Sequence, residues 1–397
     1  MIARTLVVVL LAGCSDPTWK TLEARSSGAF GDPSWIDERA LRTSLELAAE
    51  HLVSQQRPSG LFRYQYDVVL GEESSEDNIV RQLGSYWALA LLLGDPEAKL
   101  PPDLHERALR AFERMSGWIR ERRRTYEHAP GAAWIALDGE VPTGAIALCA
   151  LALIERVRAG DRADEPLLRE ILAYLAATQR PDGGFADNYS PRRGRLSRSS
   201  NPYADGEVLL AFAKDHNELG DRAYEAVLDR AMPALRRRWF ESREVDRKKG
   251  FYQWGTMAFW QYARSHPAAR RKYEDAILRY ADWMVLEHQT LGRARNTSYA
   301  VEGLATAFQV ARARGDRPRA RGLRYAILKT HARLISAQIG HPLTRKNPFI
   351  ASIPKAHLPR DRTRGGFLNG HEDPTLRIDV TQHAVHAILL TLEHDVL

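Results

Sequence analysis

Acidic side chains stand beside a recurring small residue in several apolar segments of this chain. Asp205 precedes Gly206 and Glu302 precedes Gly303, and Glu207 and Asp379 lie near the same aligned position. Hydrolysis of a glycosidic bond needs two carboxyl groups flanking that bond, one of them kept protonated by its surroundings. We therefore expect Asp205 and Glu302 to form a catalytic pair, with Glu207 and Asp379 in reserve. The alternative is that Asp205 and Asp379 cap helices, because Asp is preferred at helix starts.

A second set of side chains could catalyse an elimination reaction on a uronate sugar. His383 would be the base that removes the proton next to the carboxylate, and Tyr299 would be the acid. Arg81 or Arg377 would neutralise the substrate carboxylate through paired hydrogen bonds. Hydrolysis and elimination both remain open at this point.

Two histidines near the end of the chain raise the question of a metal. His383 and His386 are three residues apart, so they share one face of a helix. A metal site would need a third ligand, for which His371 or Asp379 is available. The chain contains no His-Glu-x-x-His or other zinc spacing, no P-loop and no dinucleotide fingerprint. We predict neither a metal nor a cofactor.

The segments that must position these residues are helical in pattern. Charged amphipathic segments alternate with short, Ala-rich segments that are apolar all round, such as 86–93 and 145–154. A helix with a polar face is peripheral and one that is apolar all round is buried. We therefore predict outer helices near 37–54, 103–124, 165–178, 222–239, 268–288 and 317–337, each paired with an inner helix.

One small residue recurs at the same register in the inner segments. The aligned residues are Gly84, Gly144, Gly206, Gly255, Gly303 and Ala384. Because glycine inside a helix costs about 1 kcal/mol relative to alanine, the repetition indicates that crowded helices approach closely there. The aligned residues are 48 to 81 positions apart, whereas open helical solenoids have nearly constant periods. We therefore favour a closed ring of six helix pairs over an open solenoid.

A short loop motif occurs twice. Residues 179–185 read Gln-Arg-Pro-Asp-Gly-Gly-Phe, and residues 56–62 share five of those seven residues. The motif resembles the repeat of terpenoid cyclases and protein prenyltransferases. The six outer-inner pairs resemble the six-hairpin glycosidases and the related polysaccharide lyases and epimerases. Both resemblances imply an all-α (α/α)6 toroid, here over residues 36–397. The motif by itself suggests an isoprenoid-type toroid as an alternative, which would require a deep apolar cavity.

The long connections precede the inner helices, so the N-terminal ends of these helices should surround one mouth of the toroid. Backbone N–H groups at such ends favour anions. Aromatic rings stack on sugars, and amides, carboxylates and guanidinium groups bond their hydroxyl groups. The basic loop 192–198 could attract an anionic glycan to this mouth or face anionic head groups of a membrane. The substrate-binding residues expected there are Arg81, Gln82, Tyr203, Tyr252, Trp254, Asn296, Arg377, Asp379 and Gln382.

The first residues form a targeting signal. Arg4 precedes a short apolar run, and Leu11-Ala12-Gly13-Cys14 resembles the lipobox of bacterial lipoproteins. That resemblance implies a signal peptide over 1–13, palmitate or a related lipid on Cys14, and a tether over 15–35. Ser15 resembles the outer-membrane sorting pattern, so we expect a protein anchored in the outer membrane of the cell envelope, facing the periplasm or the exterior.

Composition bounds the function. The chain has 397 residues, 27% of them charged, a net charge of +7 and two cysteines, which excludes a multi-span membrane protein and a disulfide framework. The second, Cys149, lies in an apolar run and should be a buried hydrophobe. We expect a monomeric lipoprotein with a carbohydrate-active toroid of the glycoside hydrolase, lyase or epimerase type, acting on an envelope or imported, anionic glycan and not on nucleic acid. The rival hypothesis is a non-catalytic toroid that binds a glycan or another partner in the same mouth.

Overall fold

The computed structural model describes residues 19, 22, 26, 30–293, 295–370 and 373–397. Cys14, residues 15–18, 20–21, 23–25 and 27–29 of the expected tether, and His371 lie outside these described residues. Within the described part of the chain, no helix is both long enough and apolar enough to cross a membrane.

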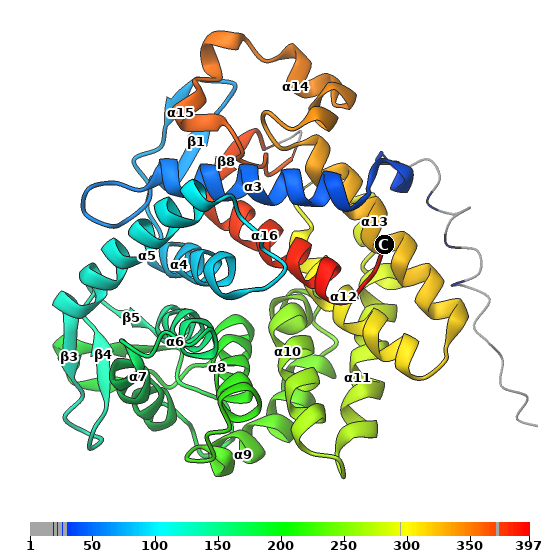
Figure 1. Cartoon of the computed structure of the whole chain (residues 1–397). Coiled ribbons are helices and arrows are strands. Elements are labelled where there is room, and N and C mark those ends of the chain that lie inside the picture. Colours follow the sequence, from blue (N-terminus) through cyan, green and yellow to red (C-terminus); the bar gives the residue numbers. More distant parts are fainter. Residues whose placement is uncertain (1–18, 20–21, 23–25, 27–29, 294, 371–372) are drawn as a thin grey trace, which may run out of the picture.

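Six helix pairs make up the body of the protein, as the alternating pattern predicts (Figure 1). The outer helices of the pairs lie at the periphery in the view of Figure 1, among them α5, α9, α11 and α13. Outer before inner, the pairs are α3 (Glu38–Gln55) with α4 (Ile79–Gly94), α5 (Pro102–Arg122) with α6 (Thr143–Arg158), α7 (Glu165–Ala177) with α8 (Pro202–Lys214), α9 (Glu225–Leu235) with α10 (Val245–Ser265), α11 (Arg270–Asp282) with α12 (Ser298–Ala313), and α13 (Arg317–Ser336) with α16 (Ile378–Glu393).

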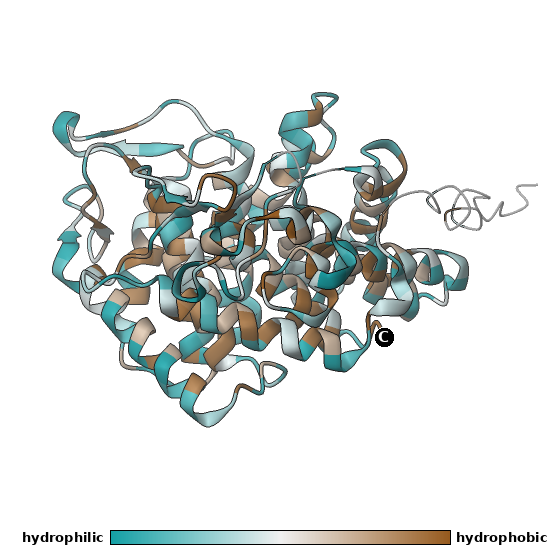
Figure 2. Cartoon of the chain, turned by 90° about the horizontal axis from the view of Figure 1, so that it is seen from above, coloured by the Kyte–Doolittle hydropathy of each residue, from teal (hydrophilic) through white to brown (hydrophobic). Residues whose placement is uncertain are grey.

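The inner helices close into a ring. Each packs on the next in the order α4, α6, α8, α10, α12 and α16, and α16 packs back on α4. The closed toroid is therefore confirmed and the open solenoid is wrong. The physical reason is burial: every residue of α6 from Thr143 to Glu155 is buried, so this helix needs neighbours on all sides. The outer helix α5 buries only one stripe, including Leu104, Ala108 and Phe112. Figure 2 shows that hydrophobic segments gather in the interior of the body, while hydrophilic segments lie mostly at its edges.

The aligned glycines allow the inner helices to approach one another. A Cβ at Gly206 would lie 2.6 Å from Cβ of Trp254 on α10, and a Cβ at Gly303 would lie 2.5 Å from the Tyr252 ring. No real Cβ sits so close, so an alanine at either position would force the helices apart. The predicted reason for the glycine repeat is confirmed at these positions.

The repeated loop motif fastens neighbouring pairs to one another. In both copies the Gln and the Phe form an isolated antiparallel bridge, Gln56 with Phe62 and Gln179 with Phe185. The Gln56 amide donates to the Ala111 carbonyl on α5 at 2.6 Å, and the Gln179 amide donates to a carbonyl of α9 at 2.9 Å. Each copy of the motif lies in the loop between the outer and the inner helix of one pair and is hydrogen-bonded to the outer helix of the next pair. We call this contact a clamp.

Short strands build one mouth of the ring. β1 (Gln65–Asp67) pairs antiparallel with β2 (Glu72–Glu73) and with β8 (Thr375–Arg377), with Tyr66 opposite Glu73 and Leu376. β6 (Asn188–Ser190) pairs with β5 (Val141–Pro142) and β7 (Arg195–Leu196), and β3 (Arg123–Thr125) pairs with β4 (Ala133–Ile135). Two short helices, α14 (Pro348–Ser352) and α15 (Arg360–Thr363), lie in the long loop before β8. β2, β5, β7 and β8 precede the inner helices α4, α6, α8 and α16, so they hold the starts of these helices.

Candidate active site

A cavity of about 610 Å³ opens at the N-terminal ends of the inner helices. Every inner helix contributes to its wall, as predicted for this mouth of the toroid. The side chains that line it are mostly polar or charged. They are Asn78, Arg81, Asp187, Asn201, Tyr203, Glu207, Lys249, Gln253, Trp254, Arg293, Arg295, Asn296, Tyr299, Asn369, Arg377, Asp379, Gln382 and His383, with Val80, Pro142, Gly144, Leu148 and Ala204. This lining argues against the isoprenoid alternative, which required an apolar cavity.

Glu207 is a buried acid in the cavity wall. It lies on α8, is 4% exposed and faces Gly144 of α6, where no Cβ fills the space that its carboxyl group occupies. Burial raises the pKa of Glu207 to about 8, and the nearby His383 offsets only part of that effect. A carboxyl group with such a pKa keeps its proton at neutral pH, so Glu207 can donate a proton to a substrate oxygen.

His383 lies in the same wall and is held from behind by a second buried acid. Its Nδ1 is 2.8 Å from Oε1 of Glu302 on α12, and Glu302 is fully buried. Because a carboxylate accepts, Nδ1 carries the hydrogen and Nε2 is left for a substrate. Burial lowers the pKa of His383, but the charge of Glu302 and its hydrogen bond outweigh burial and raise it overall. His383 is therefore a strengthened base with a fixed orientation.

His386 approaches the same carboxylate from the other side. Its Nδ1 is 3.8 Å from Oε1 of Glu302. Its ring lies edge-on to the Trp87 ring, with the two ring centroids 4.6 Å apart, and it lines a second cavity of about 320 Å³. Burial lowers the pKa of His386 to about 4, so this histidine is neutral. His383 and His386 therefore share one helix face, as predicted, and both rings on that face lie beside the Glu302 carboxylate.

Positive charge dominates the cavity wall. Besides Glu207, the two acidic side chains of the wall, Asp187 and Asp379, face five cationic side chains. One of them, Asp379, is already engaged by Arg377 at 2.8 Å and Arg81 at 3.3 Å. The cationic residues that line the cavity are Arg81, Lys249, Arg293, Arg295 and Arg377. The arrangement leaves unpaired positive charge for an anionic ligand.

Tyr299 stands at the start of α12 on the cavity wall. Its hydroxyl is 3.4 Å from Nε2 of His288, and Lys249 lies over its ring at 5.3 Å. Burial raises the pKa of Tyr299 to about 12. Tyr299 is therefore protonated and is a donor at this edge of the cavity.

Most of the residues predicted from the sequence line this cavity. Gln82 and Tyr252 do not: Gln82 bonds the backbone of Phe62, and the Tyr252 hydroxyl donates to the Ala300 carbonyl at 3.2 Å. Both are buried between helices because they point away from the mouth. The predicted residues in the wall are Arg81, Tyr203, Trp254, Asn296, Tyr299, Arg377, Asp379, Gln382 and His383, together with the reserve carboxyl group of Glu207.

The structure does not bring Asp205 and Glu302 to one cleft, and this corrects the expected pair. Asp205 is fully buried outside the cavity, where it accepts hydrogen bonds from the Phe185 backbone N–H at 2.7 Å and from Nε1 of Trp239 at 2.7 Å. Gln82 bonds Phe62 in the same way in the first copy of the motif. Asp205 therefore anchors the repeated loop. Glu302 acts on the cavity only through His383.

Sequence reasoning missed several cavity residues. Lys249 lies in the first turns of α10, while Arg293, Arg295 and Asn369 come from loops far apart in the chain. No local pattern marks them, because their shared location follows from ring closure. The conspicuous basic loop 192–198 contributes none of the cavity-lining residues, and its Arg192, Arg193, Arg195 and Arg198 are exposed.

Solved structures share this fold. No family model matches the sequence and no curated protein matches it. The structure is similar to D-mannose isomerase, with a TM-score of 0.60, 12% identity and coverage of 90% of this chain and 98% of that one. It is also similar to a GH76 α-mannanase of Bacteroides thetaiotaomicron (TM-score 0.57, 10% identity, 90% and 97% covered) and to an unsaturated glucuronyl hydrolase specific for heparin (0.53, 11%, 91% and 99%). These similarities confirm the all-α (α/α)6 toroid fold.

Proposed function

We propose that this protein is a carbohydrate-active enzyme that moves protons on an anionic sugar held in the cavity. The observation that carries the proposal is His383, which lines the cavity with its Nδ1 fixed by buried Glu302 while protonated Glu207 lies in the same wall. General acid–base catalysis needs one group that accepts a proton and one that donates a proton, each kept in that state by its own surroundings.

The chemistry follows from these positions. Nε2 of His383 takes the proton from the carbon next to a carbonyl or carboxylate, and the electron pair of that C–H bond moves onto the substrate oxygen. Glu207 gives its proton to that oxygen. Glu302 is a positioning residue that stabilises the imidazolium. Return of a proton to the other face of the carbon gives epimerisation, return to the neighbouring carbon gives isomerisation, and loss of a neighbouring leaving group gives elimination.

The wall of the cavity supports an anionic sugar as substrate. Arg81 and Arg377 can bond a carboxylate or phosphate group, although they share Asp379. Tyr203, which is 47% exposed, offers aromatic surface to a sugar ring. Among the described residues, Oε1 of Gln253 and Nε1 of Trp254 are buried without a hydrogen-bond partner, so a side-chain movement would be needed to bring them to sugar hydroxyl groups.

Two of the structural neighbours are in keeping with this proposal. One is an isomerase of a sugar, and another is a hydrolase of unsaturated glucuronyl groups that is specific for heparin, an anionic glycan. Sugar chemistry is thus supported as the general class. The reaction itself is argued from the cavity residues of this chain.

Glycoside hydrolysis is the second candidate. Glu207 would protonate the leaving oxygen, and Asp379 would be the second carboxylate. The protonated state of Glu207 favours this reaction as much as the first. However, the two Arg contacts of Asp379 occupy oxygens that an attacking carboxylate or a water molecule would need.

Proton exchange in heavy water distinguishes these candidates. We expect the purified protein, incubated with hexuronic acids, sugar phosphates and polyuronates in D2O, to replace a C–H hydrogen by deuterium, as followed by NMR. Elimination adds an ultraviolet-absorbing unsaturated product. New reducing ends without deuterium at carbon would assign hydrolysis. Binding of the sugars without either change would assign a non-catalytic binding toroid.

The dependence of turnover on pH should reflect the titration of Glu207. Because its pKa is raised to about 8, the acid is protonated below this pH and loses its proton above it. We expect turnover to fall about tenfold per pH unit above pH 8. Glu207→Gln should lower turnover at pH 7 and abolish that alkaline limb, and Asp187→Asn in the same cavity is the control. If Glu207→Gln still loses turnover above pH 8 as the wild type does, the titrating group is another residue.

For the location we propose the lipid-anchored form that the sequence pattern indicates. Cys14 would carry the lipid. The expected tether of 15–35 is shortened, because Trp19 and Leu22 are buried in the core and Nε1 of Trp19 donates to Asp282 at 2.9 Å, so the residues between Cys14 and Trp19 would link the toroid to the envelope membrane. Labelled palmitate should enter the full-length chain in a bacterial host and should not enter Cys14→Ser. Equal labelling of both chains would exclude this site of attachment.

A further inference from the structure

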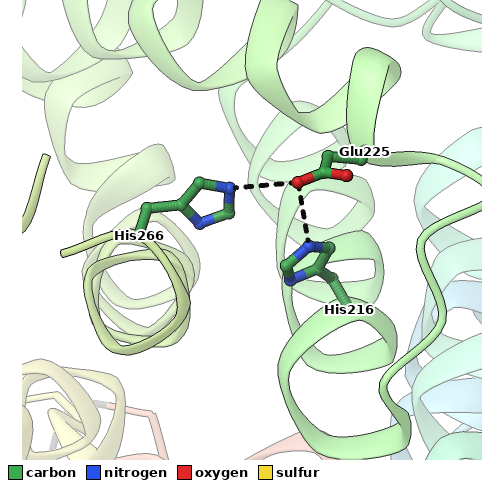
Figure 3. Close-up of side chains that lie close together, drawn as sticks. All are labelled: His216, Glu225 and His266. Atoms are coloured by element: carbon green, nitrogen blue, oxygen red, sulfur yellow. Dashed lines mark ion pairs between the residues drawn. The ribbon is translucent and has the colours of Figure 1, made fainter. Parts of the chain in front are cut away.

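Three side chains converge far from the cavity, at the opposite ends of the inner helices (Figure 3). His216 lies in the π-helical turn Asp215–Leu219 that follows α8, Glu225 begins α9, and His266 directly follows α10. Nε2 of His216 is 3.5 Å from Oε1 of Glu225, and Nε2 of His266 is 3.9 Å from the same oxygen. Asp229, one turn further along α9, places Oδ1 3.6 Å from Nε2 of His266.

His216 is a buried imidazole whose nitrogens lack hydrogen bonds. The residue is 7% exposed, and within the described part of the chain neither Nδ1 nor Nε2 has a hydrogen-bond partner. Buried polar groups in folded proteins are nearly always paired, so these nitrogens call for an explanation. Glu225, the acid it faces, stands too far away for a good hydrogen bond.

Nε2 of His266 also faces Glu225 and, among the described residues, has no hydrogen-bond partner. Nδ1 of the same ring is 2.9 Å from the Ser265 hydroxyl and 3.2 Å from the Tyr262 carbonyl. The carbonyl only accepts and the hydroxyl can accept as well, so we place the hydrogen on Nδ1, where it satisfies both contacts. The lone pair of Nε2 then points at the oxygens of Glu225 and Asp229. A lone pair beside two carboxylates is unfavourable unless a cation lies between them. Metal-binding histidines characteristically donate their other ring N–H to a carbonyl in this way.

We propose that His216, His266 and Glu225, which converge already, bind one zinc ion together with Asp229, which now approaches the group through His266 and becomes the fourth ligand. The ligand atoms already lie close together: Oε1 of Glu225 is 3.5 Å from Nε2 of His216 and 3.9 Å from Nε2 of His266, and Oδ1 of Asp229 is 3.6 Å from Nε2 of His266. Zn–N and Zn–O bonds of about 2.0–2.2 Å in a tetrahedron require ligand atoms about 3.3 Å apart. Small side-chain movements therefore complete the site. Two imidazoles with carboxylates suit zinc better than magnesium or calcium, which prefer oxygen ligands.

Neighbouring contacts orient the carboxylates. The Tyr262 hydroxyl donates to Oδ1 of Asp229 at 2.7 Å, and the Tyr262 ring stacks on His266. Arg222 donates to Oε1 of Glu225 at 3.4 Å, but its side chain is 71% exposed and can turn into solvent. Four protein ligands leave no open position, so the ion is structural. It ties α9 to the ends of α8 and α10.

Zinc binding by the full chain tests the proposal. After treatment with a chelator, the wild type should bind one Zn2+ per chain in calorimetry and should unfold at a higher temperature with Zn2+ than without it. His216→Gln and His266→Gln should weaken this binding by about 100-fold or more. His105→Gln, on the exposed face of α5, should bind like the wild type. Mg2+ should give no shift.

Two results would overturn the site. One is wild-type protein that binds no stoichiometric Zn2+; the other is His216→Gln that binds it as tightly as the wild type. Anomalous diffraction at the zinc edge needs no variant and must place the ion among these four side chains.

Discussion

Replacing His383 by glutamine is expected to lower turnover of the anionic sugar by about 10²–10⁴-fold, the usual contribution of a general base. The glutamine amide can still donate to Glu302, so the buried carboxylate keeps a partner and the fold is retained. What is lost is the nitrogen that takes the substrate proton. Deuterium exchange at the substrate carbon, measured by NMR, reports that step directly.

His386→Gln is the matched control. His386 lies one turn along the same helix and faces the same carboxylate at 3.8 Å, but it lines the second cavity. Its replacement should cost far less turnover than that of His383. Equal losses in the two variants would mean that both act only by holding Glu302, and the proposed base would have to be sought elsewhere in the cavity.

Asp205→Ala should destabilise the protein by about 2–5 kcal/mol. The substitution leaves two buried donors, the Phe185 backbone N–H and Nε1 of Trp239, without their acceptor. Each unsatisfied buried donor costs about 1–3 kcal/mol. Urea unfolding followed by circular dichroism measures the loss.

Asp182→Ala, in the same loop, is the control for this prediction. Its side chain is 42% exposed and pairs with Arg180 and Arg238, so its removal should cost about 1 kcal/mol or less. The opposite pattern, with Asp205→Ala as stable as the wild type but unable to turn over substrate, would restore Asp205 as a catalytic acid.

The helix pattern of this protein could be predicted from the sequence because it depends on local periodicity. A segment such as 145–154 is apolar on every face and must be surrounded, and a segment such as 103–124 has one apolar face and must be peripheral. The aligned glycines indicated where the surrounded helices touch. The loop motif indicated a repeated structural element, and both copies form the same bridge and the same clamp.

The chemistry of the mouth could be predicted only in part. The starts of the inner helices were expected to surround it, and Arg81, Tyr299, Arg377, Asp379 and His383 do line the cavity. The zinc-type cluster carried no sequence signal, because His216, Glu225 and His266 lie on three elements with no regular spacing. Their proximity arises only when α9 packs beside the ends of α8 and α10.

The face that each acid presents was decided by the tertiary structure. Asp205 and Glu207 are two residues apart on α8, which separates them by about 200° around the helix axis. One therefore points into the clamp and the other into the cavity, and only the packing of α8 between α6 and α10 selects which. The sequence by itself determined the helices, their order and the polar mouth. The structure determined that Glu207 and His383 meet there, because the direction of a side chain depends on neighbours that are distant in the chain.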